Sequence, residues 1–291
     1  MSQKTRARLM LSGAMAIFGT IGLFVRNIGV SSPELALYRA VIAVLLLSGY
    51  FLWRRQPIAL KAIGKELPLL LLSGAAMGVN WILLFEAYKY TTVSVATLSY
   101  YFAPVIVTLA CPLLFKEQMG WVQWVSFLMS PLGLVRITGL GDLSSGASHL
   151  TGILFGLGAA VLYASVMLLN KGIRGVSGLQ RTYLQFLAAA AVLLPYVLLS
   201  GSMSLGALDA PGWVNLLLVG GVHTCLAYCL YFPAMKHLPG QEVAILSYID
   251  PLLACVLSVT LLGESMGPLQ LLGGALILGF TLLNELHPHR K

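Results

Sequence analysis

The sequence predicts an all-α integral membrane protein with ten transmembrane helices, arranged as two inverted five-helix repeats. The first observation is composition: 58% of the 291 residues are hydrophobic, only 10% are charged, and the mean hydropathy is +0.87. Soluble chains carry roughly a quarter charged residues, so this composition excludes a water-facing surface around a chain of this size. The second observation is that apolar residues form long blocks with short polar breaks, and the third is an internal repeat.

Ten apolar segments each come near the roughly 20 residues that a helix needs to cross a bilayer. They are 9–28, 34–53, 67–88, 92–115, 120–139, 150–170, 180–200, 211–232, 241–262 and 267–286. Charged and turn residues separate them, such as Arg54-Arg55-Gln56-Pro57 after the second segment and Asp209-Ala210-Pro211 before the eighth. The third and fourth segments, and the eighth and ninth, have almost no linker, which predicts tight helical hairpins.

The distribution of Lys and Arg predicts that both termini lie in the cytoplasm. With the N-terminus inside, 14 of the 18 basic residues fall on the cytoplasmic side, and the others are Arg26, Arg39, Lys89 and Arg136. This asymmetry follows the positive-inside rule, so the formal net charge of +8 does not indicate a nucleic-acid partner. The apolar run after the basic N-terminus is too long for a cleavable signal peptide, and we expect a first membrane span there.

An internal repeat runs through the chain with an offset of 147 residues, the difference between Glu117 and Glu264. Glu117-Gln118-Met119-Gly120 returns as Glu264-Ser265-Met266-Gly267, and the same offset pairs Pro104 with Pro251, Tyr101 with Tyr248, and Lys89 with Lys236. Apolar composition does not explain matches of Pro, Glu, Lys and Tyr. We therefore predict two five-span domains, 1–140 and 150–286, joined by a Gly-, Ser- and Asp-rich connection and followed by a cytoplasmic tail, 287–291.

An odd number of spans in each half means that the second copy crosses the membrane in the opposite sense from the first. Two such halves can exchange conformations, which is the basis of alternating access in secondary transporters. Duplication also suits a rigid scaffold, a channel or a receptor, but transport accounts most directly for the inversion. Glycines predict close, movable helix packing in the first and sixth spans, namely Gly13, Gly19, Gly22, Gly152, Gly156 and Gly158.

Several motifs carry a family resemblance. They are Phe18-Gly19, Ser32-Pro33 with Leu37 and Arg39, Pro104 followed by Glu117, Pro251 followed by Glu264, and Gly273-Gly274. With these motifs the chain resembles the EamA family of the drug/metabolite transporter superfamily over essentially its whole length. It departs from the family pattern at Phe18, where Trp often precedes the glycine, and at Gln185, where the second half would repeat Arg39.

The resemblance implies ten helices around a central cavity, with the fifth and tenth spans outside it. It also implies a multi-pass protein of the bacterial inner (plasma) membrane that moves small metabolites, often outward. Similar proteins export amino acids, and more distant ones exchange nucleotide sugars or drugs. We therefore expect a secondary-active, alternating-access exporter of a small metabolite such as an amino acid, with proton coupling as an option. Its expected partners are that small molecule and the lipid bilayer, and its oligomeric state stays open.

Asp250 is the candidate coupling residue and the candidate substrate-binding carboxylate. It precedes Pro251 midway along the expected ninth span, and a proline disfavours helical geometry at the residue before it. A carboxylate at a helix interruption can bind a proton, a sodium ion or the ammonium group of a substrate. The alternative is a neutral Asp hydrogen-bonded to a neighbouring helix. The first half has Ala103 at the equivalent place, so the fold does not require this charge.

Aromatic residues gather in the segments that should line the cavity. Ring stacking and the attraction of cations to ring faces suit an apolar or ammonium-bearing substrate, although aromatic residues also fill helix interfaces. Two polar residues join them, of which His223 could relay protons or simply bond across helices. The predicted substrate-binding residues are Trp81, Tyr100, Tyr101, Tyr228, Tyr248, Asp250, Asn80 and His223.

Other polar residues have structural as well as functional interpretations. Arg39 could hold a carboxylate through two hydrogen bonds, but packing and anchoring at the membrane interface is the favoured interpretation. Glu86 is expected near the outer end of the third span, paired with Lys89. The recurrence of Glu117 and Glu264 at equivalent helix ends favours a structural role in each hairpin, with a gate as the alternative.

Other classes of function find less support in the sequence. A flippase of a lipid or lipid-linked sugar should carry a basic headgroup pocket, and Arg39 is essentially the lone intramembrane cation; an exporter of cationic drugs is a further alternative. A membrane enzyme needs a catalytic constellation, and the sequence shows no metal spacing, phosphate loop or nucleophile elbow. Cysteine behaves as a small hydrophobe inside apolar segments, where Cys111, Cys225, Cys229 and Cys255 all fall. We predict no catalytic residue, metal or cofactor.

Overall fold

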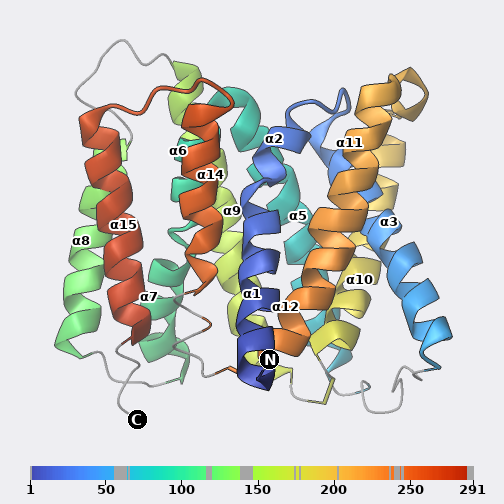
Figure 1. Ribbon diagram of the computed structural model, residues 1–291, viewed down its shortest axis with the longest axis horizontal. Coiled ribbons are helices and arrows are strands. Elements are labelled where there is room, and N and C mark those ends of the chain that lie inside the picture. Colours follow the sequence, from blue (N-terminus) through green and yellow to red (C-terminus); the bar gives the residue numbers. More distant parts are fainter. Residues whose placement is uncertain are drawn as a thin grey trace.

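The computed structural model describes residues 2–55, 64, 66–115, 120–137, 147–173, 175–176, 178–201, 203–235, 237–238, 243 and 246–286. Every secondary-structure element in these ranges is a helix, and the helices stand side by side (Figure 1). Among the described residues seven helical segments are long and apolar enough to cross a membrane, and two shorter apolar helices, Ile249–Thr260 and Pro268–Leu283, accompany them. An all-α membrane protein is thus confirmed, whereas ten spans stay a prediction.

The helices of the first half are α1 (Gln3–Gly19), α2 (Ile21–Val25), α3 (Ser32–Trp53), α5 (Leu67–Tyr90), α6 (Val93–Tyr100), α7 (Ala103–Phe115) and α8 (Trp121–Ile137). Those of the second half are α9 (Ala147–Gly172), α10 (Gly178–Leu199), the short η1 (Leu205–Ala207), α11 (Ala210–Gly220), the π-helical η2 (Gly221–Leu226), α12 (Ala227–Met235), α14 (Ile249–Thr260) and α15 (Pro268–Leu286). The start of α1 and the end of α15 lie at the same end of the bundle, called here the lower end (Figure 1). Which side of a membrane this end faces stays a prediction.

Polar residues at the breaks between apolar segments begin the helices. Ser31 and Glu34 form a capping box at the start of α3, and Thr92 accepts a hydrogen bond from the Val95 amide at the start of α6. Asp209 accepts one from the Gly212 amide before α11. Each cap satisfies backbone N–H groups that the first helical turn leaves without a partner. The predicted break at Asp209-Ala210-Pro211 is confirmed, and so is the tight connection between α5 and α6.

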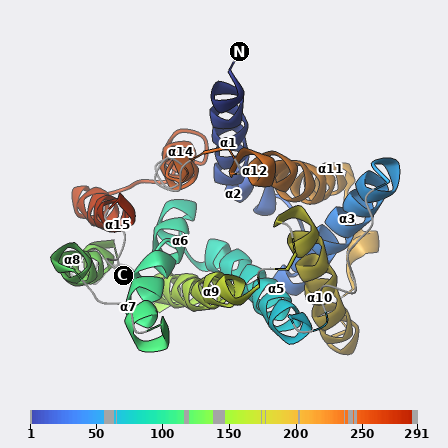
Figure 2. The same cartoon turned by 90° about the horizontal axis from the view of Figure 1, so that it is seen from below.

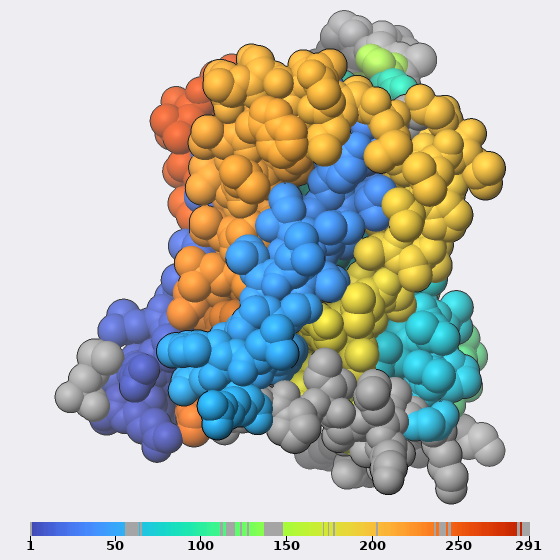
Figure 3. Space-filling model, turned by 90° about the vertical axis from the view of Figure 1, so that its right-hand side faces the viewer, coloured from blue at the N-terminus to red at the C-terminus, as the bar shows by residue number. Residues whose placement is uncertain are grey.

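Contacts between the helices place α8 and α15 apart from the rest. These two pack against each other at one side of the bundle (Figure 2). In the main body α5 packs against α9 and α10, α12 packs against α1, and α14 packs against α1 and α6. On another face α3 lies obliquely between α10 and α11 (Figure 3). Exposed side chains of these three helices are commonly apolar, as a lipid-facing surface requires, for example Leu45, Leu46, Leu194, Leu198, Val214 and Leu217.

Some predictions fall on residues outside the described ranges. Glu117, Lys236 and the tail 287–291 are among them, and so is most of the predicted connection at 139–149. The tight hairpin predicted between the eighth and ninth spans is also untested, because most residues between α12 and α14 are outside these ranges.

Candidate substrate-binding cavity

A cavity of about 550 Å³ lies inside the bundle, between residues of α1, α2, α3, α5, α6, α7, α9, α12 and α14. This volume is in the range of small-molecule sites, roughly 300–1,000 Å³. Nine of the lining residues are aromatic, and seven of these are tyrosines. Arg39 and Asp250 are the charged side chains among the described lining residues, and no described residue of α8 or α15 reaches the cavity. The walls are therefore apolar and aromatic with two opposite charges.

Two interrupted helices place polar residues at this cavity. The helix of the fourth span ends at Tyr100 and restarts at Ala103, so that Pro104 lies in the first turn of α7. In the second half α14 begins at Ile249, so that Asp250 and Pro251 lie in its first turn. A proline is tolerated there because the N–H that it lacks would have no helical partner. Pro251 therefore lies in the first turn of α14 and not within a continuous helix.

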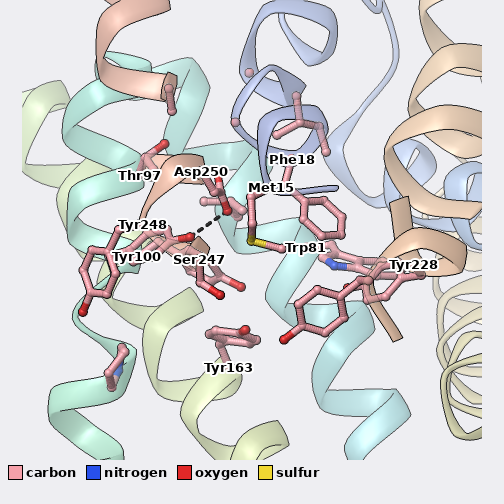
Figure 4. Close-up of a pocket in the computed structure, with 18 of the residues that line it drawn as sticks. Met15, Phe18, Trp81, Thr97, Tyr100, Tyr163, Tyr228, Ser247, Tyr248 and Asp250 are labelled. Atoms are coloured by element: carbon pink, nitrogen blue, oxygen red, sulfur yellow. Dashed lines mark hydrogen bonds between the residues drawn. The ribbon is translucent and has the colours of Figure 1, made fainter. Parts of the chain in front are cut away.

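Asp250 bonds across the two interruptions. The Tyr101 hydroxyl donates a hydrogen bond of 2.7 Å to Asp250 Oδ2, which the dashed line in Figure 4 marks. The backbone at Asp250 also lies against α1, because a Cβ atom added to Gly19 would come within 2.6 Å of the Asp250 carbonyl oxygen. Asp250 thus has both of the features expected as alternatives: it bonds to a neighbouring helix, and it lines the cavity.

Arg39 is buried at the cavity, with 4% of its surface exposed. Its Nε donates a hydrogen bond of 2.9 Å to Thr224 Oγ1, and its guanidinium carbon lies 4.2 Å from the centroid of the Trp81 ring. This burial agrees with the packing part of the prediction, whereas a place at the level of the membrane interface stays a prediction. The signal in the sequence was a cation inside an apolar span, since such a residue faces the protein interior.

A π-helical turn supports this arginine from the second half. Within Gly221–Leu226 the Thr224 hydroxyl donates to the Val219 carbonyl at 2.7 Å, and His223 Nδ1 lies 3.1 Å from the Leu218 carbonyl. Each of these side chains reaches the carbonyl five residues back. Single π turns inside α-helices are frequent at functional sites. No feature of the sequence predicted this turn.

Six of the eight predicted site residues line the cavity. They are Trp81, Tyr100, Tyr101, Tyr228, Tyr248 and Asp250, and Figure 4 shows all but Tyr101 with labels.

The structure places Asn80 and His223 outside the lining, where they join helices. Asn80 Nδ2 donates to the Ala159 carbonyl of α9 at 2.6 Å, and His223 Nε2 lies 2.9 Å from Thr20 Oγ1 at the end of α1. Both side chains are buried with these partners, so neither points to a substrate. Several other lining residues lie in helices that were predicted correctly but were not predicted to line the cavity, among them Met15, Phe18, Tyr88 and Tyr163.

A polar network holds the helices together at the upper end, opposite the start of α1. Arg26 forms an ion pair of 2.6 Å with Glu264 and also donates 2.8 Å to the Thr91 carbonyl. Glu264 accepts hydrogen bonds from the Val93 amide, at 2.9 and 3.1 Å, and from the Ser258 hydroxyl. Since Val93 also lines the cavity, this network contacts the cavity wall at that end.

Two other predictions concern polar side chains away from the cavity. Glu86 does pair with Lys89, at 3.1 Å. The cysteines Cys225, Cys229 and Cys255 are partly buried and free. Among the residues that the structure describes, there is no group of three or more His, Cys, Asp or Glu side chains that could hold a metal ion.

A bundle of apolar helices around an aromatic, doubly charged cavity defines a multi-pass membrane protein with a small-molecule site. The model of the EamA-like transporter family matches this chain twice, over residues 5–139 and again over 150–285. The chain therefore belongs to the EamA-like transporter family, within the drug/metabolite transporter superfamily. It is a membrane transporter and not an enzyme.

Relatives of known name agree with this assignment. An uncharacterized transporter of Archaeoglobus fulgidus is 31% identical, with 95% of this chain and 94% of the relative covered. YxxF, an uncharacterized transporter of Bacillus subtilis, is 29% identical over 94% of this chain and 88% of its own. The threonine/homoserine exporter RhtA of Escherichia coli is 28% identical, over 87% and 83%. A solved crystal structure matches with a TM-score of 0.68 and 19% identity over 97% of both chains, which shows a shared fold.

Proposed function

We propose that this transporter exports a small ammonium-bearing metabolite, most simply an amino acid, through the cavity and across the bacterial inner membrane. The observation that carries the proposal is the place of Asp250, a carboxylate in the wall of an aromatic cavity at a helix interruption. Its described hydrogen-bond partner is the neutral Tyr101 hydroxyl, so its negative charge is available to a cation. Tyrosine rings around it would hold the rest of the molecule by stacking and by contact with ring faces.

Alternating access by two inverted repeats, 1–140 and 150–286, is the proposed mechanism. The double match of the family model supports two repeats. The packing partners also exchange between the halves: α5 packs on α9 as α12 packs on α1, and α6 packs on α9 as α14 packs on α1. The Arg26–Glu264 network would hold one end of the cavity shut while the other end opens. The basic residues support an orientation with both termini in the cytoplasm.

The choice of an amino acid draws on a relative and on the cavity. RhtA is a threonine/homoserine exporter, and it matches most of this chain. An exporter of cationic drugs is the second candidate, because the same carboxylate and tyrosines would bind an organic cation without a carboxylate. Coupling to protons is part of the proposal, with Asp250 as the group that would exchange the proton and the ammonium.

The test is solute counterflow in proteoliposomes, with labelled amino acids, polyamines and quaternary amines, each with and without a pH gradient. We expect an amino acid to accumulate in the wild type and to be lost in Asp250→Asn. Glu86→Gln is the matched control, because Glu86 is a carboxylate outside the cavity lining in a partly exposed ion pair. Movement of headgroup-labelled lipid without accumulation of any solute would replace this proposal by a flippase. Transport at the same rate with and without the pH gradient would contradict the proton coupling in this proposal.

A further inference from the structure

We propose that Arg39 is the carboxylate-binding end of the cavity and that Thr224, in the π-helical turn, positions it. The transported molecule would then need a carboxylate as well as an ammonium group. This inference rests on the proposed function and narrows it, because a purely cationic drug would leave Arg39 without a partner. It assigns a specificity-determining residue and a positioning residue within the same cavity.

The first argument is the unmet bonding capacity of Arg39. A guanidinium has five N–H donors, and in the described residues only Nε has a hydrogen-bond partner, the Thr224 hydroxyl. The two terminal nitrogens lie in a residue that is only 4% exposed and that lines the cavity. A buried charge without a paired anion is unfavourable, and the Trp81 ring face offsets only part of that cost. A ligand carboxylate fits the two terminal nitrogens through a pair of parallel hydrogen bonds.

The second argument is that the cavity contains no anion already committed to Arg39. Asp250 is the acidic side chain among the described lining residues, and its hydrogen bond goes to Tyr101. The ion pairs in which both partners are described are Arg26 with Glu264 and Lys89 with Glu86, so Arg39 and Asp250 form no direct ion pair with each other. Two opposite charges on the walls of one small cavity match a zwitterion, with one pole for each.

The third argument concerns the direction of the Thr224 hydroxyl. Its proton is donated to the Val219 carbonyl, so the oxygen can only accept from Arg39 Nε. With Nε held there and the guanidinium carbon over the Trp81 ring, the terminal nitrogens are the donors left for a ligand. The π turn makes this possible because it shifts Val219 and Thr224 into bonding register. Thr224 is therefore a positioning residue that acts through Arg39.

The two poles belong to different halves of the chain. Arg39 lies on α3 of the first half, and Asp250 lies on α14 of the second. The repeat offset places Ala103 opposite Asp250 and Met77 opposite Thr224, so neither device occurs in both halves. A zwitterion bound at both poles would join the two halves, whereas an amine or an acid alone would contact one of them. Figure 4 shows Asp250 and Trp81, the ring under Arg39, around the same space.

The experiment is competition counterflow with labelled L-threonine, L-leucine and L-phenylalanine, each against its own carboxamide and its decarboxylated amine. In the wild type we expect the amino acid to compete at least about tenfold better than its carboxamide, the scale of one charge-assisted pair. Arg39→Gln should abolish this preference while the amine competes as before. Arg39→Lys should keep part of the preference, because Lys supplies charge without the paired geometry.

Thr224 is tested by a matched set. Thr224→Val should raise the KM for the amino acid roughly 3- to 10-fold with little change in kcat. The reason is that the lost hydrogen bond fixes the orientation of the Arg39 guanidinium and does not change its charge. Thr224→Ser, which keeps the hydroxyl, should have the KM of the wild type. Thr182→Val is the control, since Thr182 is equally buried and its hydroxyl bonds only to its own helix, at the Gly178 carbonyl. The comparison of Thr224→Val with Thr224→Ser still tests the inference if Arg39→Gln does not fold.

The outcomes separate the two proposals. Transport of amino acids and carboxamides with equal preference in the wild type would overturn the role of Arg39 and leave export of ammonium compounds standing. Equal loss of all competitors in Arg39→Gln would make Arg39 a structural residue and would also overturn the inference. No accumulation of any labelled solute in the wild type would overturn the proposed function, and the inference with it.

Discussion

The two helix interruptions of this transporter share a backbone and differ in chemistry. Pro104 lies in the first turn of α7 and Pro251 in the first turn of α14, at equivalent repeat positions. The residue before the proline is Ala103 in one half, packed against Ala160 and Ala164 of α9, and Asp250 in the other, at the cavity. The interruption therefore occurs in both halves, whereas the charge occurs in the second half alone.

A second pair of equivalent helices differs in the same way. α5 is one continuous helix that supplies Trp81, whereas its counterpart is divided into α11, a π turn and α12. The π turn supplies Thr224 to Arg39 and His223 to Thr20. The carboxylate of Asp250 and the π turn with Thr224 are thus specific to the second half, whereas a tyrosine lines the cavity at the equivalent positions Tyr101 and Tyr248 of both halves.

The largest effect is expected from copying the charge into the first half. Ala103→Asp would place a carboxylate among buried alanines of α9, away from the cavity. An Asp at the centre of a membrane helix costs about 3 kcal/mol or more, a large part of the stability of most domains. We expect little monodisperse protein in size-exclusion chromatography. Normal yield of a folded Ala103→Asp protein would show that the two positions are more alike than the structure indicates.

The reverse change removes the asymmetry from the second half. Asp250→Ala makes the two interruptions alike, and we expect folded protein whose initial counterflow rate falls roughly 100-fold, because the ammonium loses its anion. Circular dichroism and thermal unfolding in detergent serve as the fold control. Retention of more than a third of the rate would contradict a substrate or coupling role for Asp250.

A smaller effect is expected where α1 approaches the second interruption. Gly19→Ala would bring a Cβ within 2.6 Å of the Asp250 carbonyl, whereas an added Cβ at Gly13 meets nothing within 4 Å. Overpacking of this kind costs typically about 1–3 kcal/mol, so Gly19→Ala should lower the unfolding temperature. We also expect its transport rate to fall roughly tenfold. Gly13→Ala is the matched control and should behave as wild type. Equal unfolding temperatures and transport rates of the two variants would show that transport does not depend on the close contact between α1 and α14.

The smallest effect is expected at the hydrogen bond that joins the two interruptions. Tyr101→Phe removes the donor to Asp250 and should change the apparent affinity about 3- to 10-fold with the fold intact. Tyr183→Phe is the control, because its hydroxyl bonds to Ser48, away from the cavity lining. Identical kinetics of both variants would mean that Tyr101 does not orient Asp250.

The sequence predicted more of the scaffold than of the site. Apolar blocks and the charged and turn residues between them were enough to place most helices, because each of these signals depends on a few neighbouring residues of the chain. Six of the predicted site residues do line the cavity, and Asp250 is among them because an ionisable residue within an apolar span faces the bundle interior. Asn80 and His223 do not line the cavity as predicted, because the hydrogen-bonding capacity of a buried polar side chain is equally satisfied by a bond to another helix.

By itself the sequence determined an all-α membrane protein with a duplicated chain and a charge at one of two equivalent interruptions. Only the tertiary structure decided that Arg39 is buried on Trp81, that Thr224 holds it from a π turn, and that Tyr101 bonds to Asp250. The physical reason is the distance along the chain over which each interaction acts. Hydropathy and proline act locally, whereas the partner of a polar side chain inside a bundle depends on which helix faces are packed together, and residues far apart in the chain supply those faces.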